Sequence, residues 1–153
     1  MEYISAEEFL KQPKEAQKVF KEWWKPEIGD LVYVDCIEDN AIIIKKEVSN
    51  YYGICLIKEN AIVRHNIKCN LIPLFAEGQL RKFIEDKLNS KIEIVYASKE
   101  GVRDENSYYR IEKVNFLDGD INKSVWKVET DDLLQAYWKV AIKIAEKEVK
   151  ANE

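Results

Sequence analysis

Apolar residues recur three and four positions apart in three stretches of the chain, the spacing typical of a helix with one buried face. This pattern predicts helices over residues 13–25, 77–88 and 130–149. The apolar face of the last stretch is the widest, because it includes adjacent pairs such as Leu133-Leu134 and Tyr137-Trp138. We therefore expect this C-terminal helix to pack against a sheet or between other elements.

Polar residues mark where the predicted helices begin. Ser5 is followed three positions later by Glu8, the spacing of a capping box, and predicts a short helix over residues 5–11. Pro13 suits the first turn of the next helix, because its missing N–H has no partner to lose there. Thr130 is the predicted N-cap of the C-terminal helix.

Elsewhere short runs rich in β-branched and aromatic residues alternate with polar turns, a pattern that predicts strands. Residues 58–60, Lys-Glu-Asn, are expected to form a hairpin loop. The predicted strands cover residues 31–34, 41–44, 51–57, 61–64, 68–72, 91–96, 108–116 and 124–128. Together the elements predict an α+β fold: a largely antiparallel sheet, two N-terminal helices, one inserted helix and one long C-terminal helix. A chain of 153 residues without a linker predicts a single domain over residues 1–153.

Composition and charge limit the partners and the cellular location that the sequence favours. Hydrophobic residues make up 46% of the chain, enough for a packed core. The net charge of −4 and the pI near 5.3 indicate that nucleic acid is not the main partner. The first residues are acidic, and the longest apolar run, Ala41 to Ile44, is far shorter than the ~20 residues that a bilayer requires. We therefore expect a cytoplasmic protein without a membrane partner.

The cysteines and the single histidine offer little chemistry. Cys36, Cys55 and Cys69 are odd in number and have apolar neighbours, which favours reduced, buried thiols. Their separations do not match a zinc motif, so no metal and no cofactor are expected. Cys69 lies four residues after His65, but an inert buried thiol is a commoner explanation than a catalytic dyad. No catalytic residue is predicted, and the chain is not expected to be an enzyme.

Adjacent tyrosines are the one biased feature. Neighbouring residues in a strand point to opposite faces, so one tyrosine of each strand pair should face solvent or a cleft. Arg103 lies in a predicted polar loop, in a chain that otherwise prefers lysine. Core packing with an amphipathic rim explains most such tyrosines. The alternative is a contact surface for a ligand or partner, formed by Tyr51, Tyr52, Tyr108 and Arg103.

Three segments carry a resemblance. Residues 71–85 combine a proline at a strand end with a Gln-Leu helix start, residues 133–141 read Leu-Leu-Gln-Ala-Tyr-Trp-Lys-Val-Ala, and residues 23–30 read Trp-Trp-Lys-Pro-Glu-Ile-Gly-Asp. This combination resembles small phage and prophage proteins of low-GC bacteria, a family of unknown function. The 18 isoleucines, 20 lysines and 10 asparagines agree with an AT-rich genome.

The resemblance implies a soluble, non-enzymatic binding protein of phage or prophage origin, with a host or phage protein as partner and with inhibition of a defence protein as one role. An alternative is a domain that binds or sequesters a small, nucleotide-type ligand. No functional residue is transferred by the resemblance, and the oligomeric state stays open.

Overall fold

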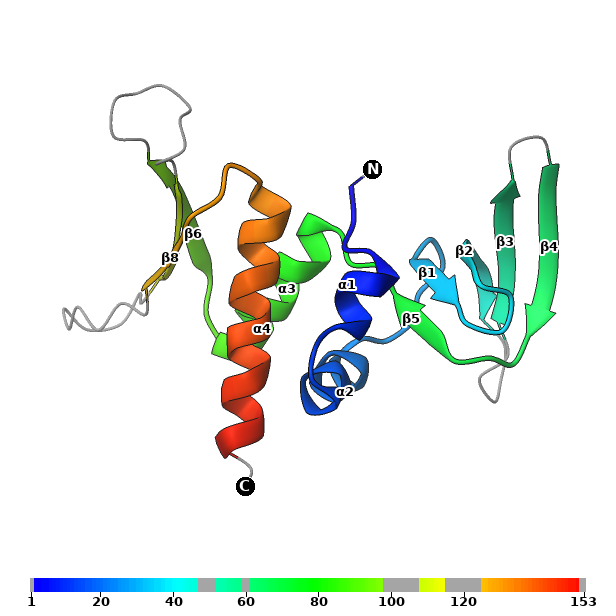
Figure 1. Cartoon of the computed structure of the whole chain (residues 1–153), viewed down its shortest axis with the longest axis horizontal. Helices are drawn as coiled ribbons and strands as arrows, with labels where there is room; N and C mark the ends of the chain where they lie inside the picture. The colour runs from blue at the N-terminus through cyan, green and yellow to red at the C-terminus, as the bar shows by residue number, and fades with distance from the viewer. Residues whose placement is uncertain (1, 47–51, 59–60, 98–107, 115–124, 152–153) are drawn as a thin grey trace. The chain divides into compact units, whose positions relative to one another are not determined.

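The structure is a computed structural model that describes residues 2–46, 52–58, 61–97, 108–114 and 125–151. It confirms the α+β class, with four helices and eight strands in the described part of the chain. Figure 1 shows their arrangement along the chain. In chain order the elements are α1 (Ala6–Leu10), α2 (Lys14–Trp23), β1 (Leu31–Val34), β2 (Asp39–Lys46), β3 (Tyr52–Lys58), β4 (Ala61–Ile67), β5 (Leu71–Pro73), α3 (Glu77–Leu88), β6 (Ile92–Ala97), β7 (Tyr108–Lys113), β8 (Val125–Val128) and α4 (Leu133–Ala151).

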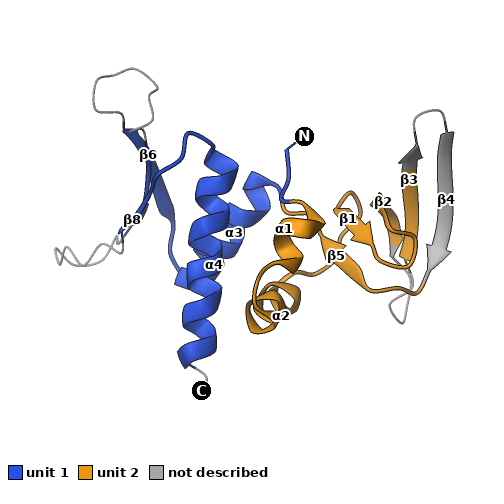
Figure 2. Cartoon of the chain, in the orientation of Figure 1, with its two compact units in different colours: residues 1–4, 76–153 blue, residues 5–75 orange. Residues whose placement is uncertain are grey.

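The strands form two antiparallel sheets where the sequence predicts one, and the chain divides into two compact units (Figure 2). The N-terminal unit consists of residues 5–75, and the C-terminal unit of residues 1–4 and 76–153. Each unit has its own helices and its own sheet. The single domain over residues 1–153 stays a prediction.

The N-terminal unit contains a five-stranded sheet in the order β4-β3-β2-β1-β5. Its first strand matches its predicted bounds, and its last strand ends at Pro73 as predicted. Since β1 pairs with β2 on one side and with β5 on the other, Val32 lies between Ala41 and Pro73. All three residues are buried. This long-range β1–β5 pairing brings the end of the unit back to its first strand.

Aromatic rings from both helices fill the core of the N-terminal unit. Phe9 of α1, Phe20 of α2 and Phe75, two residues after β5, are fully buried. Their ring centroids lie 5.6 to 6.1 Å apart, at the tilted and edge-on angles that aromatic pairs prefer. The Trp23 ring lies 6.2 Å from that of Phe75. The helical stripe predicted from the sequence is therefore a core stripe.

Local hydrogen bonds fix the ends of α1 and α2. The Ser5 hydroxyl accepts the N–H of Glu8 at 3.2 Å, as the capping box predicts. Pro13 is the N-cap of α2 and lies just before its first turn. The buried Gln17 side chain donates to the carbonyls of Leu10 and Gln12, at 3.1 and 2.7 Å. These bonds satisfy a buried amide and close the connection between the two helices.

The C-terminal unit packs α3 and α4 against one face of the three-stranded sheet β6-β7-β8. Cross-strand pairing and alternation place Ile92, Ile111 and Val128 on that inner face, where all three are buried. The wide apolar face of α4 is buried as predicted, with Trp138 and Val140 among its buried residues.

The start of α4 differs from the prediction. The helix begins at Leu133, and the Asp132 carboxylate accepts the N–H of Gln135 at 3.1 Å. Thr130, the predicted cap, instead accepts the N–H of Asp132 at 3.1 Å. Asp132 competes well for the cap, because a carboxylate also favours the positive end of the helix dipole. Among the described residues, no helix has the length and apolar content needed to cross a membrane.

Candidate functional site

The four predicted contact residues fall in different places. Tyr51 and Arg103 lie outside the described residues, as does the polar loop predicted around Arg103. Tyr52 lies in β3 of the N-terminal unit and is 8% exposed. Tyr108 begins β7 of the C-terminal unit and is half-buried. The described pair thus belongs to two units, and Tyr108 is the more accessible of the two.

Tyr108 lies on the face of the three-stranded sheet that alternation directs away from α3 and α4. We call this surface the outer face, formed by Val95, Tyr108, Arg110, Val125 and Lys127. The Lys127 ammonium lies 4.2 Å from the centroid of the Tyr108 ring, a cation–π contact. This contact orients the ring while both side chains keep accessible surface.

Cross-strand register arranges the outer face in rows. Val95 pairs with Arg110, which pairs with Lys127 in the neighbouring strand. Val95 is 38% exposed and Val125 is 46% exposed. Arg110 forms an ion pair with Glu112, two residues along the same face. The outer face therefore combines accessible apolar surface with an oriented tyrosine and an oriented guanidinium.

A second accessible feature is a groove of about 650 Å³ between the end of α3, β8 and α4. Its lining includes the half-buried Trp126 ring and the exposed Lys143 and Lys147, one helical turn apart on α4. Lys87 lines the same groove and forms an ion pair with Glu148 at 2.7 Å. The three lysines of the lining outnumber its two carboxylates, Asp86 and Glu148, so the groove beside the indole favours a planar anionic molecule. Sequence reasoning missed this groove, because its lining comes from three separate elements.

Polar contacts between α3 and β6 are structural. The Glu85 carboxylate accepts from Arg81 at 3.2 Å and from Lys91 at 2.7 Å, and Arg81 also donates to the Ile92 carbonyl at 3.3 Å. Burial acts to raise the pKa of Glu85, but the bonds from Lys91, Arg81 and the Ile92 backbone outweigh it and lower that pKa. Burial raises the pKa of Tyr137 in α4.

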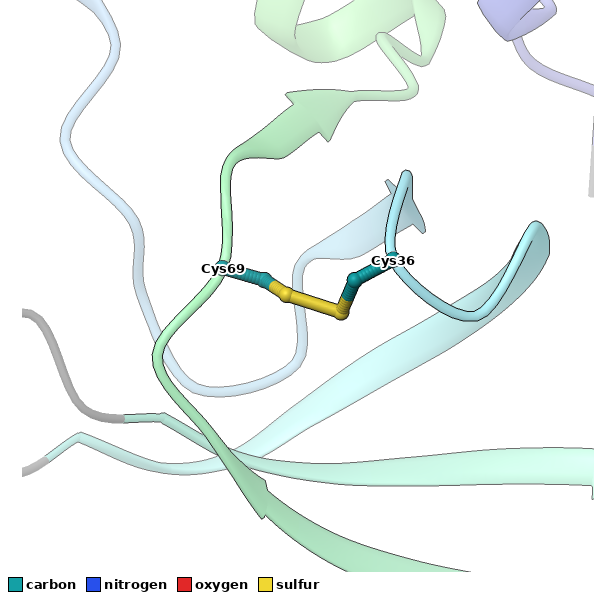
Figure 3. The surroundings of a disulfide bond; sticks show 2 residues. All are labelled: Cys36 and Cys69. Carbon is teal, nitrogen blue, oxygen red and sulfur yellow. A yellow bond between two sulfur atoms is a disulfide. The ribbon is translucent and has the colours of Figure 1, made fainter.

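Two of the three cysteines are not the reduced, buried thiols that the sequence predicts. Cys36 and Cys69 form a disulfide (Figure 3), with Cys36 exposed and Cys69 half-buried. Cys55 is free and half-buried. Cys69 consequently has no thiol for the dyad with His65 that its spacing allows. The prediction failed because the pairing of β1 with β5, which unites these cysteines, has no local signal in the sequence.

No family model matches the chain, and neither the curated proteins nor the solved structures gave a significant match.

Proposed function

We propose that the protein is a non-enzymatic binding protein of phage or prophage origin that binds a host or phage protein in the bacterial cytoplasm, with inhibition of a defence protein as its role. The accessible valines that flank Arg110 on the outer face, Val95 and Val125, are the observation that carries this proposal. Burying such side chains against a partner stabilises a complex by removing apolar surface from water.

The residue types of the outer face support protein binding. Tyrosine and arginine supply much of the binding energy at protein interfaces, where apolar centres are surrounded by polar rims. Tyr108 and Arg110 are each oriented by a neighbour, so little side-chain freedom remains to be lost on binding. Val95 and Val125 lie in the two edge strands on either side of them.

The origin and location rest on the resemblance of residues 23–30, 71–85 and 133–141 to phage and prophage proteins. A cytoplasmic location has a consequence for Cys36 and Cys69, because reducing conditions oppose disulfides there. We expect this pair to alternate between dithiol and disulfide during the life of the protein.

The test is affinity capture from a lysate of a low-GC bacterium with matched surface variants. The double variant Val95→Lys, Val125→Lys should recover the specific partner at least tenfold less efficiently than the unchanged protein, since each lysine places a charge on apolar surface that the partner would bury. Lysine is tolerated at solvent-facing positions of edge strands, so folding is preserved.

The matched control is Ile28→Lys. Ile28 is 69% exposed and lies in the N-terminal unit, so this variant makes the same kind of change elsewhere. Partner recovery should equal that of the unchanged protein. Capture that yields no specific protein, or that is equally efficient with the double variant, contradicts the proposal.

The groove beside Trp126 favours a second candidate, the binding of a small nucleotide-type ligand. Trp126 would stack on the planar base, and Lys143 and Lys147 would neutralise phosphate charge. A thermal-shift screen against nucleotides tests this: a ligand at 100 times its Kd stabilises the folded state by about 2.7 kcal/mol. The shift should disappear in Lys143→Ala, Lys147→Ala and persist in the single variant Val95→Lys, which changes the outer face at a position that does not line the groove.

A further inference from the structure

Three metal-binding side chains meet at one end of the β1–β5 pair. The sulfur atoms of Cys36 and Cys69 and a carboxylate oxygen of Asp35 all lie within 4.8 Å of one another. Asp35 and Cys36 are exposed and Cys69 is half-buried, so the group is accessible from solvent. Figure 3 shows the two cysteine side chains pointing toward each other from separate segments.

Strand register explains why the two cysteines meet. Val34 pairs with Leu71 at the last position of the β1–β5 ladder. Cys36 lies two residues after Val34, and Cys69 lies two residues before Leu71. The β1–β5 pairing thus brings together the turn that follows β1 and the segment that precedes β5. The Cα atoms of the two cysteines are 6.4 Å apart.

The turn that follows β1 supplies the third donor. Residues 35–38 form this turn, where the N–H groups of Ile37 and Glu38 donate to the Val34 carbonyl at 3.1 and 2.8 Å. The turn places Asp35 next to Cys36 on a backbone fixed by hydrogen bonds. Two chain segments that are far apart in sequence therefore present the three donors.

We propose that, in the reduced protein, Asp35, Cys36 and Cys69 bind one thiophilic divalent cation of the zinc class. Two thiolates and one carboxylate are a ligand set that zinc accepts, whereas magnesium and calcium prefer oxygen ligands alone. Tetrahedral zinc keeps two thiolate sulfurs roughly 3.8 Å apart, given Zn–S bonds of about 2.3 Å. The 6.4 Å separation of the Cα atoms accommodates that spacing. Three protein ligands leave a fourth position for water.

The metal-bound form and the disulfide form exclude each other. A dithiol reductant breaks the Cys36–Cys69 bond by supplying two electrons and two protons, and its own two sulfurs join as a disulfide. The two resulting thiols then release two protons to solvent when the cation binds them as thiolates. Oxidation by a disulfide reverses both steps and releases the cation. This site does not depend on the outer face, which belongs to the C-terminal unit.

Cobalt(II) is the probe for the site, because cobalt bound to thiolates absorbs in the near ultraviolet and gives visible bands in tetrahedral coordination. Protein reduced with a phosphine under anaerobic conditions should bind one cobalt ion per chain with both absorptions, and zinc should displace it. The oxidised protein should give neither absorption. Reduced protein without the near-ultraviolet absorption overturns the proposal.

Substitutions test which side chains are the metal ligands. Cys36→Ser should abolish the thiolate absorption of the bis-thiolate site, and Asp35→Asn should weaken cobalt binding at least tenfold. The matched control is Cys55→Ser, which removes the half-buried free cysteine and should leave binding unchanged. Circular dichroism of each reduced variant verifies that it is folded. Equal cobalt affinity in Asp35→Asn, or loss of binding in Cys55→Ser, contradicts the assigned ligand set.

Discussion

The two units are similar in length but are stabilised by different kinds of contact. In the N-terminal unit, the contacts that close the core join residues far apart in sequence: β1 pairs with β5, Cys36 bonds to Cys69, and Phe9 packs on Phe75. In the C-terminal unit, α3 packs on α4 and polar contacts of Glu85 join α3 to β6. The N-terminal unit is therefore stabilised by a disulfide and by packed aromatic rings, whereas the C-terminal unit is stabilised partly by contacts between charged side chains.

This difference predicts different vulnerabilities. A disulfide responds to reductant and is indifferent to mild acid, whereas a carboxylate network responds to acid and is indifferent to reductant. The same chain should therefore lose stability in one unit or in the other according to the solution conditions. Amide hydrogen exchange read by mass spectrometry distinguishes the two, because it reports protection for peptides of each unit separately.

Removal of a buried aromatic ring should cause the largest loss of stability, and that loss should be confined to the unit that contains the ring. Phe20→Ala deletes a fully buried ring that contacts Phe9 and Phe75, and we expect it to destabilise the N-terminal unit by about 3–5 kcal/mol. Phe83→Ala, at a fully buried position of α3, should cost a similar amount in the C-terminal unit. Amide exchange should therefore accelerate mainly within residues 5–75 for the first variant and within residues 76–151 for the second. Uniform acceleration in both variants would mean that the two units unfold as one.

Loss of the Cys36–Cys69 disulfide should cause the second-largest loss of stability. The bond joins residues 33 positions apart, a loop for which chain entropy predicts about 3–4 kcal/mol of stabilisation. Denaturant unfolding of Cys36→Ser, Cys69→Ser under oxidising conditions should show this loss, concentrated in peptides of residues 5–75. Cys55→Ser is the control and should unfold close to the unchanged protein. A double variant as stable as the oxidised parent would show that the closed loop adds nothing to the core.

Sequence reasoning found the local features and missed those that depend on distant pairing. The three- and four-residue spacing of Ala16, Val19 and Trp23 identified a helix, because 3.6-residue periodicity is a local signal. Pro73 ended its strand as expected, since proline cannot extend a ladder. Whether β1 pairs with β5 or with a strand of the other sheet has no such signal. The split into two sheets therefore appeared only in three dimensions.

The candidate sites also divide into those with a local signal in the sequence and those without one. Tyr108 could be selected from the sequence because paired tyrosines in a strand alternate between faces. The partnership of Cys36 with Cys69 could not, because their spacing resembles neither a zinc motif nor a small disulfide-rich domain. Trp126, Lys143 and Lys147 form one groove through the packing of β8 beside α4, which no periodicity encodes.

Glu85 should make the stability of the C-terminal unit depend on pH, with a smaller change in unfolding free energy than the core and disulfide variants give. Glu85→Gln keeps the size of the side chain but removes the charge that Lys91 and Arg81 contact, and should cost about 1–3 kcal/mol at neutral pH. The folded-state pKa of Glu85 lies below its ordinary value of 4.5. The stabilisation is therefore complete above about pH 5 and is lost as the pH falls through 4.5 toward the lower folded value. As the pH is lowered from 7 to 3, the midpoint temperature of thermal unfolding should fall more steeply for the unchanged protein than for Glu85→Gln. Parallel pH profiles would contradict this role.

The smallest predicted effect concerns the start of α4, where two residues compete for one role. Asp132→Ala removes the carboxylate that accepts the Gln135 N–H and should cost about 1 kcal/mol. Thr130→Ala is the matched control: Thr130 accepts a bond from Asp132, outside the helix, so its loss should cost less. Denaturant midpoints for the two variants, with amide exchange at the first turn of α4, measure the difference. If Thr130→Ala is the more destabilising, the cap lies where the sequence alone predicts it. If Asp132→Ala is, the carboxylate at the positive end of the dipole decides where this helix begins.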